Sequence, residues 1–255
     1  MTDPTKPLGG QTILVTGGTG GIGAAIVERL AQEGARPIIH YSRDRQSAEA
    51  LLSRIGGNGA IVQADLSDGQ GPSLLWKQAS AIADRIDGLV NNAGIRTEVS
   101  IDAEPEIWRS AWQREFQVNF FAATDLCREA IVHFRAHGGG RIINMASRAG
   151  QRGYAANFMP YGATKAALLN LTKSIARSFG AEGVVAVAIA PGWVQTEMAE
   201  QYIAEFGKQA AVVDIPIGEM AQPSEIAEVV AFALRPSQRS LNGATLDVNG
   251  GSYIR

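Results

Sequence analysis

Short apolar runs rich in β-branched residues alternate with longer segments of helical periodicity along the whole chain. A short apolar run bounded by turn residues suits a strand that is buried on both faces. The longer segments place apolar residues every three or four positions, which is typical of helices that cover a sheet. We expect strands at 11–16, 38–41, 60–64, 88–90, 141–145, 184–190 and 244–248, and helices at 24–33, 46–55, 73–84, 104–136, 160–179 and 223–234.

This alternation predicts the α/β class, with a doubly wound parallel sheet of about seven strands and helices on both faces. No repeat, low-complexity segment or linker divides the sequence, so we expect residues 1–255 to form a single domain. The pattern is least regular at residues 193–222, and a segment of that length suggests a lid over a substrate site.

Composition excludes several classes of protein without changing this picture. The 23 basic and 25 acidic residues give a net charge of -2, which offers no electrostatic reason to expect a nucleic-acid partner. Cys127 is the only cysteine, so no internal disulfide is possible. The first residues lack the apolar run of a signal peptide, and the apolar stretch 184–190 is too short to cross a bilayer. We therefore expect a cytoplasmic protein with no membrane partner.

A glycine-rich segment, Thr16-Gly17-Gly18-Thr19-Gly20-Gly21-Ile22-Gly23, joins the first predicted strand to the first helix. Residues without a Cβ allow the backbone to turn tightly and to approach a ligand closely. The helix that follows would present unpaired N–H groups and its positive dipole end to a phosphate. At this strand–helix junction the segment favours dinucleotide binding, and the absence of a Gly-Lys-Ser/Thr ending argues against a P-loop nucleotidase.

The end of the second strand bears on which dinucleotide is bound. An acidic residue about 20 positions beyond the glycines would hold the ribose 2′-hydroxyl of NAD. Here the strand end is His40-Tyr41-Ser42-Arg43, with no acid. Arg43, helped by Ser42 and Arg45, suits a 2′-phosphate, so we expect NADP to be preferred. The neighbouring Asp44 leaves NAD possible, and a solvent-facing arginine at a helix start would give the same pattern.

Tyr161 and Lys165 lie four positions apart, which places both on one face of a helix. A free tyrosine has a pKa near 10, and a nearby ammonium group lowers that pKa toward the range of an acid or base catalyst. Ser147, on a separate segment, is able to hydrogen-bond the same substrate oxygen. By itself the Tyr-x-x-x-Lys spacing fits equally well an aromatic residue beside a solvated lysine.

Taken in order, these motifs resemble those of the short-chain dehydrogenase/reductase family over nearly the whole chain. The resemblance also rests on Asp65-Leu66, Asn91-Asn92-Ala93-Gly94, Pro191-Gly192 and the ending Asp247-Val248-Asn249-Gly250-Gly251. It implies a single-domain Rossmann fold. It also implies an NAD(P)-dependent oxidoreductase that transfers a hydride between a nicotinamide cofactor and a ketone or secondary alcohol.

The resemblance assigns a role to each catalytic residue. Tyr161 would exchange a proton with the substrate oxygen, and Ser147 would hold and polarise that oxygen. Lys165 would bind the nicotinamide ribose and lower the pKa of Tyr161, and Asn119 would support a water that relays protons. The cofactor contacts it implies are Gly17, Thr19, Gly21, Ile22, Gly23, Tyr41, Ser42, Arg43, Asp65, Leu66, Asn92, Ala93, Gly94, Tyr161, Lys165, Pro191, Gly192, Val194 and Thr196.

The substrate stays open at this stage. Residues 95–117 and 147–161 are long for the family and border the substrate side, so they give no substrate class. Our first hypothesis is an NADP(H)-preferring carbonyl reductase or secondary-alcohol dehydrogenase. A 3-oxoacyl carrier-protein reductase or a sugar or polyol dehydrogenase is the alternative. A non-catalytic dinucleotide-binding sensor is a distant alternative. We would expect a sensor to lack part of the catalytic tetrad, and this sequence has all four members, Asn119, Ser147, Tyr161 and Lys165.

Two further expectations concern metals and assembly. His133 and His137 have a spacing that can chelate zinc, but no third ligand cluster accompanies them, so we expect no metal site. Family resemblance suggests a homodimer or homotetramer, with the helices at 104–136 and 160–179 in the interface.

Overall fold

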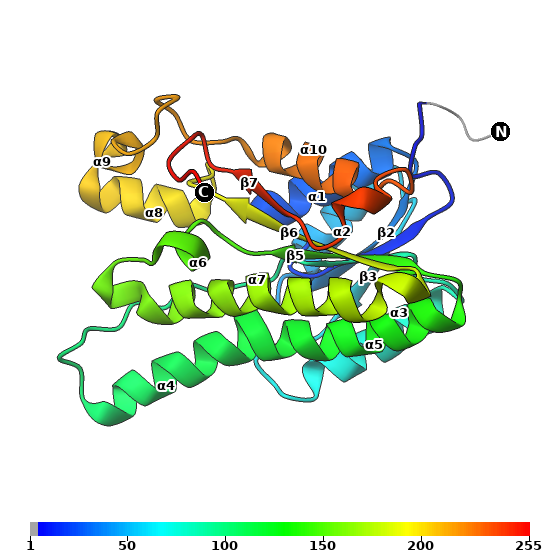
Figure 1. The fold of residues 1–255 in the computed structure, drawn as a ribbon, viewed down its shortest axis with the longest axis horizontal. Coiled ribbons are helices and arrows are strands. Elements are labelled where there is room, and N and C mark those ends of the chain that lie inside the picture. The colour runs from blue at the N-terminus through cyan, green and yellow to red at the C-terminus, as the bar shows by residue number, and fades with distance from the viewer. Residues whose placement is uncertain (1–4) are drawn as a thin grey trace.

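The computed structural model describes residues 5–255, which contain one seven-stranded parallel sheet (Figure 1). The expectation about a signal peptide rests partly on residues 1–4, which lie outside the described part. Apart from one or two residues at their ends, the predicted strands are confirmed. They are β1 (Thr12–Val15), β2 (Arg36–Tyr41), β3 (Ala60–Gln63), β4 (Gly88–Asn91), β5 (Gly140–Met145), β6 (Val184–Pro191) and β7 (Thr245–Val248).

Helices cover both faces of this sheet, as predicted. Each face has its own set of apolar contacts, because every central strand points alternate side chains to opposite sides. One face carries α1 (Gly21–Gln32), α2 (Arg45–Arg54) and α10 (Pro223–Leu234). The other carries α3 (Gly71–Ile82), α5 (Ala122–Ala136) and α7 (Met159–Phe179).

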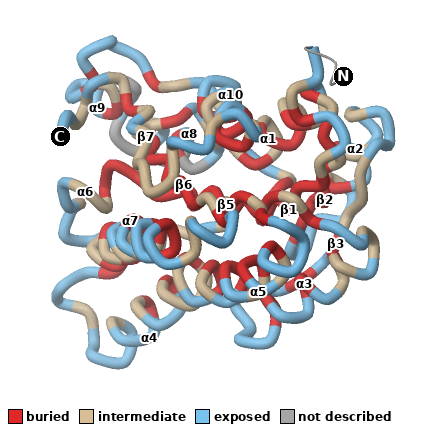
Figure 2. The backbone as a smooth tube through the Cα atoms, turned by 45° about the vertical axis from the view of Figure 1, so that its right-hand side comes forward, coloured by how far each residue is buried: buried red, intermediate tan, exposed pale blue. Residues whose placement is uncertain are grey.

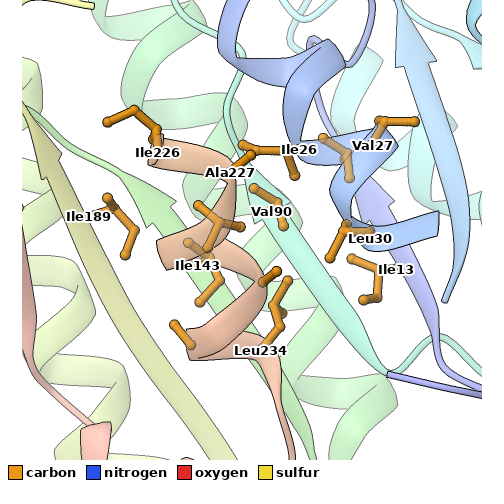
Figure 3. Packing of buried hydrophobic residues seen from close by; sticks show 14 of the residues in the cluster. Ile13, Ile26, Val27, Leu30, Val90, Ile143, Ile189, Ile226, Ala227 and Leu234 are labelled. Carbon is orange, nitrogen blue, oxygen red and sulfur yellow. The ribbon is translucent and has the colours of Figure 1, made fainter. Parts of the chain in front are cut away.

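The larger core cluster lies between the sheet and the helices α1 and α10 (Figure 3). Ile26 and Leu30 of α1 and Leu234 of α10 are fully buried there against Ile13 and Ile143. Complete burial of one such side chain contributes roughly 1.5–3 kcal/mol. Figure 2 shows the central strands buried along their length, whereas the edge strands β3 and β7 are only partly buried.

The helix predicted at 104–136 has an irregular centre. It consists of α4 (Pro105–Phe116), a π-helical turn (Gln117–Phe121) and α5, in direct succession. A π-helical turn inserts one residue into the α-helical repeat and often occurs at functional sites. Asn119 lies in this turn, and sequence periodicity did not predict the irregularity.

Residues 193–222 are more regular than predicted, because they contain α8 (Glu197–Phe206) and α9 (Lys208–Val212). The two ends of the segment are joined, since the Gln195 N–H donates to the Ala221 carbonyl at 2.9 Å and the Ala221 N–H donates to the Trp193 carbonyl at 3.1 Å. A small apolar cluster of its own includes Ala199, Ala211, Ile215 and Met220. The two helices are short and pack mainly within this segment, so no sheet-facing pattern marked them.

Shorter helical elements complete the described chain. They are α6 (Ala149–Arg152) and 3-10 turns at Ala156–Phe158, Gly180–Glu182 and Arg239–Leu241. Within residues 5–255, none of the helices has the length and apolar character required to cross a membrane.

Candidate active site

The strand order is β3-β2-β1-β4-β5-β6-β7, so successive strands are added outward on one side of β1 up to β3 and on its other side from β4 onward. In doubly wound sheets, ligands bind at the carboxyl ends of the two strands that flank such a switch point, here β1 and β4. The glycine turn follows β1 and the Asn-Asn-Ala-Gly segment follows β4, so both meet there. The Thr16 hydroxyl accepts hydrogen bonds from the N–H groups of Asn92 at 2.9 Å and Ala93 at 3.0 Å, which fastens the two segments together.

A cavity of about 400 Å³ extends from this junction to the first turns of α7. Three of the four predicted catalytic side chains line it, namely Ser147, Tyr161 and Lys165. The predicted cofactor contacts in its wall are Gly17, Gly21, Ile22, Gly23, Asn92, Ala93, Gly94, Tyr161, Lys165, Pro191, Gly192, Val194 and Thr196. Thr19 and Asn119 lie outside its lining. So do the residues predicted to contact the adenosine half of the cofactor, namely Tyr41, Ser42, Arg43, Asp65 and Leu66.

The glycine turn fits a phosphate group. A Cβ on Gly23 would lie 2.0 Å from the Gly17 carbonyl oxygen, so only glycine permits this packing. Gly21 has a φ of +48°, a left-handed conformation that glycine adopts without strain. Gly20 precedes α1 and provides no side-chain cap, and a Cβ built on it would meet nothing within 4 Å. The N-terminus of α1 is therefore open toward the cavity side and fits a dinucleotide phosphate.

His40 holds the glycine turn from behind, a role that sequence reasoning missed. The Gly17 N–H donates to His40 Nδ1 at 3.0 Å, so the ring proton must be on Nε2, which donates to the Ala64 carbonyl at 3.1 Å. Burial lowers the pKa of His40, although the Ala64 hydrogen bond opposes that effect. A neutral histidine thus links the end of β2 to the turn after β1 and to the end of β3.

The residues predicted for the adenosine half follow two neighbouring strands, β2 and β3. Ser42 and Arg43 are exposed just beyond β2, whereas Tyr41 is buried at its end. Asp65 follows β3, and its pKa is lowered by hydrogen bonds from Ser67 and, to a smaller extent, by the charge of Arg43. Leu66 is buried beside it.

Asp44 already has a structural task. It is the N-cap of α2, and its carboxylate accepts hydrogen bonds from the Ser47 N–H at 2.9 Å and the Ser47 hydroxyl at 2.5 Å. These hydrogen bonds lower the pKa of Asp44. A carboxylate held in this cap is less available to the ribose of a bound nucleotide.

Tyr161 and Lys165 lie one turn apart on α7, with the Lys165 Nζ 5.6 Å from the centroid of the Tyr161 ring. The buried ammonium group donates to the Met145 carbonyl at 2.7 Å. Burial lowers the pKa of Lys165 to about 8. Burial also raises the pKa of Tyr161 to about 12, against the opposing effect of a hydrogen bond with Ser147. In the chain alone, desolvation outweighs the Ser147 hydrogen bond and the charge of Arg96, so the pKa of Tyr161 is raised. The lowering by Lys165 that the family resemblance implies stays a prediction.

Asn119 is buried directly behind the cavity wall. Its Oδ1 accepts the Ile95 N–H at 2.7 Å, and its Nδ2 donates to the Ile95 carbonyl at 2.8 Å. The π-helical turn therefore fixes the backbone that follows β4. Glu115, one turn earlier, accepts from Asn119 Nδ2 at 3.0 Å and from the Thr97 N–H at 2.8 Å. Sequence reasoning did not single out Glu115, because an acid within a polar helix carries no signal of burial.

The two histidines considered for zinc have structural contacts. The Ile86 N–H donates to His133 Nε2 at 3.0 Å, and the His133 and His137 rings stack with centroids 4.0 Å apart. Among residues 5–255, no group of three or more His, Cys, Asp or Glu side chains is placed to hold a metal ion.

A phosphate-binding turn at the switch point, joined to a cavity with a serine, a tyrosine and a lysine, defines a dinucleotide-dependent oxidoreductase site. Comparison with known proteins gives the same result. A family profile described as "Enoyl-(Acyl carrier protein) reductase" matches residues 17–253. The chain belongs to the short-chain dehydrogenase/reductase family and is an NAD(P)-dependent enzyme that acts on CH–OH groups.

Relatives of differing specificity match almost the full chain. It is 32% identical to the 3-oxoacyl-[acyl-carrier-protein] reductase FabG of Vibrio cholerae over 97% of this chain and 99% of that protein. It is 34% identical to the cis-4-hydroxycyclohexanecarboxylate dehydrogenase of Sinomonas cyclohexanicum over 94% of this chain and 96% of that protein. A short-chain dehydrogenase/reductase variant from Serratia marcescens has a similar structure, with a TM-score of 0.89, 33% identity, and coverage of 97% of this chain and 100% of that chain.

Proposed function

We propose that this protein is an NADP(H)-preferring reductase of small carbonyl compounds in which Tyr161 donates the proton. The observation that carries the proposal is the shared cavity of Tyr161, Ser147 and Lys165 beside the glycine turn. The proposal requires a protonated Tyr161 at neutral pH, and burial, which raises the pKa of Tyr161 to about 12, favours that form. A protonated phenol suits the reduction of a carbonyl, which needs an acid at the oxygen.

Each residue of the tetrad has a part in this proposal. Ser147 donates a hydrogen bond to the substrate oxygen and holds it beside Tyr161. A nicotinamide cofactor, when bound, supplies the hydride. As Tyr161 gives up its proton, the Lys165 ammonium stabilises the phenolate that forms. Asn119 does not line the cavity. Its carboxamide holds the Ile95 backbone behind the cavity wall, whereas Lys165 faces the cavity.

The test is turnover by Tyr161→Phe, which keeps the ring and removes only the hydroxyl. We expect kcat for ketone reduction to fall by at least about 100-fold, the usual contribution of a positioned acid. Binding of NADPH, followed by its fluorescence, should change little. Tyr253→Phe is the matched control, since Tyr253 does not line the cavity. Substantial reduction by the Tyr161 variant would contradict the assigned role.

The cofactor preference rests on Arg43. It is exposed beyond β2, where its charge also contributes to the lowered pKa of Asp65 at the neighbouring strand end. A 2′-phosphate at this place would meet a guanidinium group, whereas the carboxylate of Asp44 is held in a helix cap. These contacts favour NADPH over NADH.

A 3-oxoacyl carrier-protein reductase is the second candidate, and the relatives named for that activity favour it. The choice requires a substrate panel containing an acetoacetyl thioester, neutral ketones, sugars and 4-oxocyclohexanecarboxylate. The last compound follows from the name of the Sinomonas cyclohexanicum relative. Absence of thioester turnover by an enzyme that reduces other ketones would remove the second candidate.

We also propose a lid and a dimer or tetramer. Residues 193–222 are joined at their ends and contribute Trp193, Val194, Thr196, Glu197 and Ala199 to the cavity wall, which supports a lid. Helices α4, α5 and α7 are the proposed subunit interface, and the exposed apolar side chains of Ile107 and Val132 support that choice. Light scattering during size-exclusion chromatography measures the mass of the assembly, and a monomer at micromolar concentration would contradict it.

A further inference from the structure

Arg96 belongs to the cavity wall but to none of the motifs that define the family chemistry. Its backbone is held on both sides by the helix behind it. Ile95 exchanges two hydrogen bonds with the Asn119 carboxamide, and the Thr97 N–H donates to Glu115. Arg96 therefore projects from a rigid segment directly next to the tetrad.

Its guanidinium group is positioned by aromatic residues from two other segments. The Arg96 Cζ lies 4.7 Å from the Phe158 ring centroid and 5.5 Å from the Trp193 ring centroid, both within cation–π range. The Arg96 Nη1 donates to the Tyr154 hydroxyl at 3.2 Å. The Tyr154 ring in turn lies 5.8 Å from the Tyr161 ring. This chain of contacts runs from Arg96 to the proposed proton donor.

Among the described residues, Arg96 has no carboxylate partner. No ion pair formed within the described residues includes it, whereas Arg148 and Arg152, also near the cavity, share the carboxylate of Asp214. A guanidinium group has five N–H donors in a planar fork that matches a carboxylate, and one of them is used by Tyr154. Arg96 also opposes the rise in the pKa of Tyr161 that burial causes, which agrees with a charge near the reaction centre.

We propose that Arg96 determines specificity by binding a carboxylate of the substrate, so that the preferred substrates are oxo acids and the corresponding hydroxy acids. This inference rests on the proposed function and narrows it. Arg96 would hold the carboxylate while Ser147 and Tyr161 hold the carbonyl oxygen. A short carbon skeleton would join the two groups, because the Tyr154 side chain contacts both Arg96 and Tyr161.

The experiment compares each of three oxo acids with its own methyl ester. We choose 2-oxopentanoate, 4-oxopentanoate and 5-oxohexanoate, since they vary the distance between the carbonyl and the carboxylate. For at least one pair, kcat/KM of the wild type should be about 10- to 100-fold higher for the acid, the size of a charge-assisted hydrogen bond. Arg96→Met should lower kcat/KM for the acid about 10- to 100-fold more than kcat/KM for its ester, so that the preference for the acid disappears.

Two further variants separate charge from packing. Arg96→Lys keeps the charge but loses the planar fork, and should retain part of the preference. Arg96→Gln removes the charge with less change in polarity than methionine, in case Arg96→Met unfolds. Arg109→Met is the matched control, because Arg109 is exposed on α4 outside the cavity. The same preference in wild type and Arg96→Met, or no preference in the wild type, would overturn the inference.

A binding measurement makes the inference independent of turnover. Pentanoate carries the carboxylate but no reacting carbonyl, so calorimetric titration reports Arg96 alone. We expect binding to be about tenfold weaker or undetectable in Arg96→Met. If the wild type reduces neither acids, esters nor neutral ketones, the proposed function fails while pentanoate binding still decides the role of Arg96. Equal pentanoate binding by both proteins would leave Arg96 as a brace between aromatic rings only.

Discussion

The Glu115 carboxylate accepts a hydrogen bond from the carboxamide of Asn119, one helical turn further along the chain, at 3.0 Å. Asn119 in turn accepts the Ile95 N–H. The other oxygen of Glu115 accepts the Thr97 N–H at 2.8 Å. Burial raises the pKa of Glu115, while hydrogen bonds from Thr97 and Asn119 and the charge of Lys165 oppose the rise. This acid therefore positions Asn119 and the segment that carries Arg96.

Glu115→Gln tests this positioning role. A glutamine has one acceptor oxygen, so either the Thr97 N–H or the Asn119 carboxamide loses its hydrogen bond to residue 115 in a buried place, which costs roughly 1–3 kcal/mol. We expect the free energy of unfolding in urea to fall by that amount and kcat to fall more than KM rises. Glu104→Gln, an exposed substitution at the residue that precedes the same helix and makes no side-chain cap, should change neither. An unaltered kcat in a destabilised variant would limit Glu115 to a structural role.

The pH dependence of reduction should report Lys165. Because burial lowers its pKa to about 8, the ammonium that stabilises the Tyr161 phenolate disappears as the pH rises through that value. We expect kcat/KM to be level below about pH 8 and to decline above it. Tyr161, with a pKa of about 12, stays protonated throughout this range in the free enzyme. A level profile up to pH 10 would contradict this assignment.

The same lysine should make stability depend on pH. A basic group whose pKa is lowered by folding contributes stability above its ordinary pKa of 10.5 and loses it as the pH falls through about 8. Lys165→Met removes this dependence. The free energy of unfolding of the variant minus that of the wild type, measured by urea titration, should therefore be more positive at pH 7 than at pH 10. An equal difference in the free energy of unfolding at both pH values would contradict a lowered pKa of Lys165 in the folded protein.

The strands and the phosphate turn could be predicted from sequence because their signals are local. Val184–Pro191 is a continuous apolar run, and the glycines of the turn stand next to β1 in the chain. The π-helical turn at Gln117–Phe121 had no such signal, since its apolar residues also suit an α-helix. Its cause is tertiary, namely the demand that Asn119 face Ile95.

Cofactor choice can be tested at Arg43. Loss of a charge-assisted contact to a 2′-phosphate should weaken NADPH binding about 10- to 100-fold and leave NADH binding nearly unchanged. Arg43→Ala and fluorescence titration of both cofactors measure this difference. Arg54→Ala is the control, because Arg54 pairs with Glu28 near the other end of α2. Equal weakening of both cofactors would remove the proposed preference for NADPH.

Asp214 joins residues 193–222, the proposed lid, to the residues that follow Ser147. Its carboxylate lies 3.2 Å from Arg148 Nη1 and 2.9 Å from Arg152 Nη2. The Arg148 side chain is only 4% exposed, so losing its partner leaves a buried charge.

Asp214→Asn should therefore lower the unfolding temperature and raise KM for the carbonyl substrate, because the lid loses its anchor. Thermal unfolding and steady-state kinetics measure the two effects. The control is Asp102→Asn, an exposed position outside this contact. In the double variant with Arg148→Met, part of the stability should return, since no buried charge remains. If the double variant is as unstable as the sum of the single ones, the pairing is unimportant.

Sequence reasoning named the candidate catalytic residues but not the groups that hold them. Ser147, Tyr161 and Lys165 were found because a family pattern names them. The supports, His40 and Glu115, act through backbone N–H groups of Gly17 and Thr97 that are distant in sequence. Such partners are determined by the packing of the fold. The cytoplasmic location stays a prediction from sequence.

The π-helical turn makes the position of Asn119 depend on the number of residues in its helix. Each residue of a regular α-helix advances by about 100° around the axis. Deleting one residue ahead of Asn119 would restore the regular repeat and rotate the carboxamide away from Ile95 while preserving every side chain of the tetrad. Between Pro105 and Asn119 the chain therefore tolerates changes of residue more readily than changes of length.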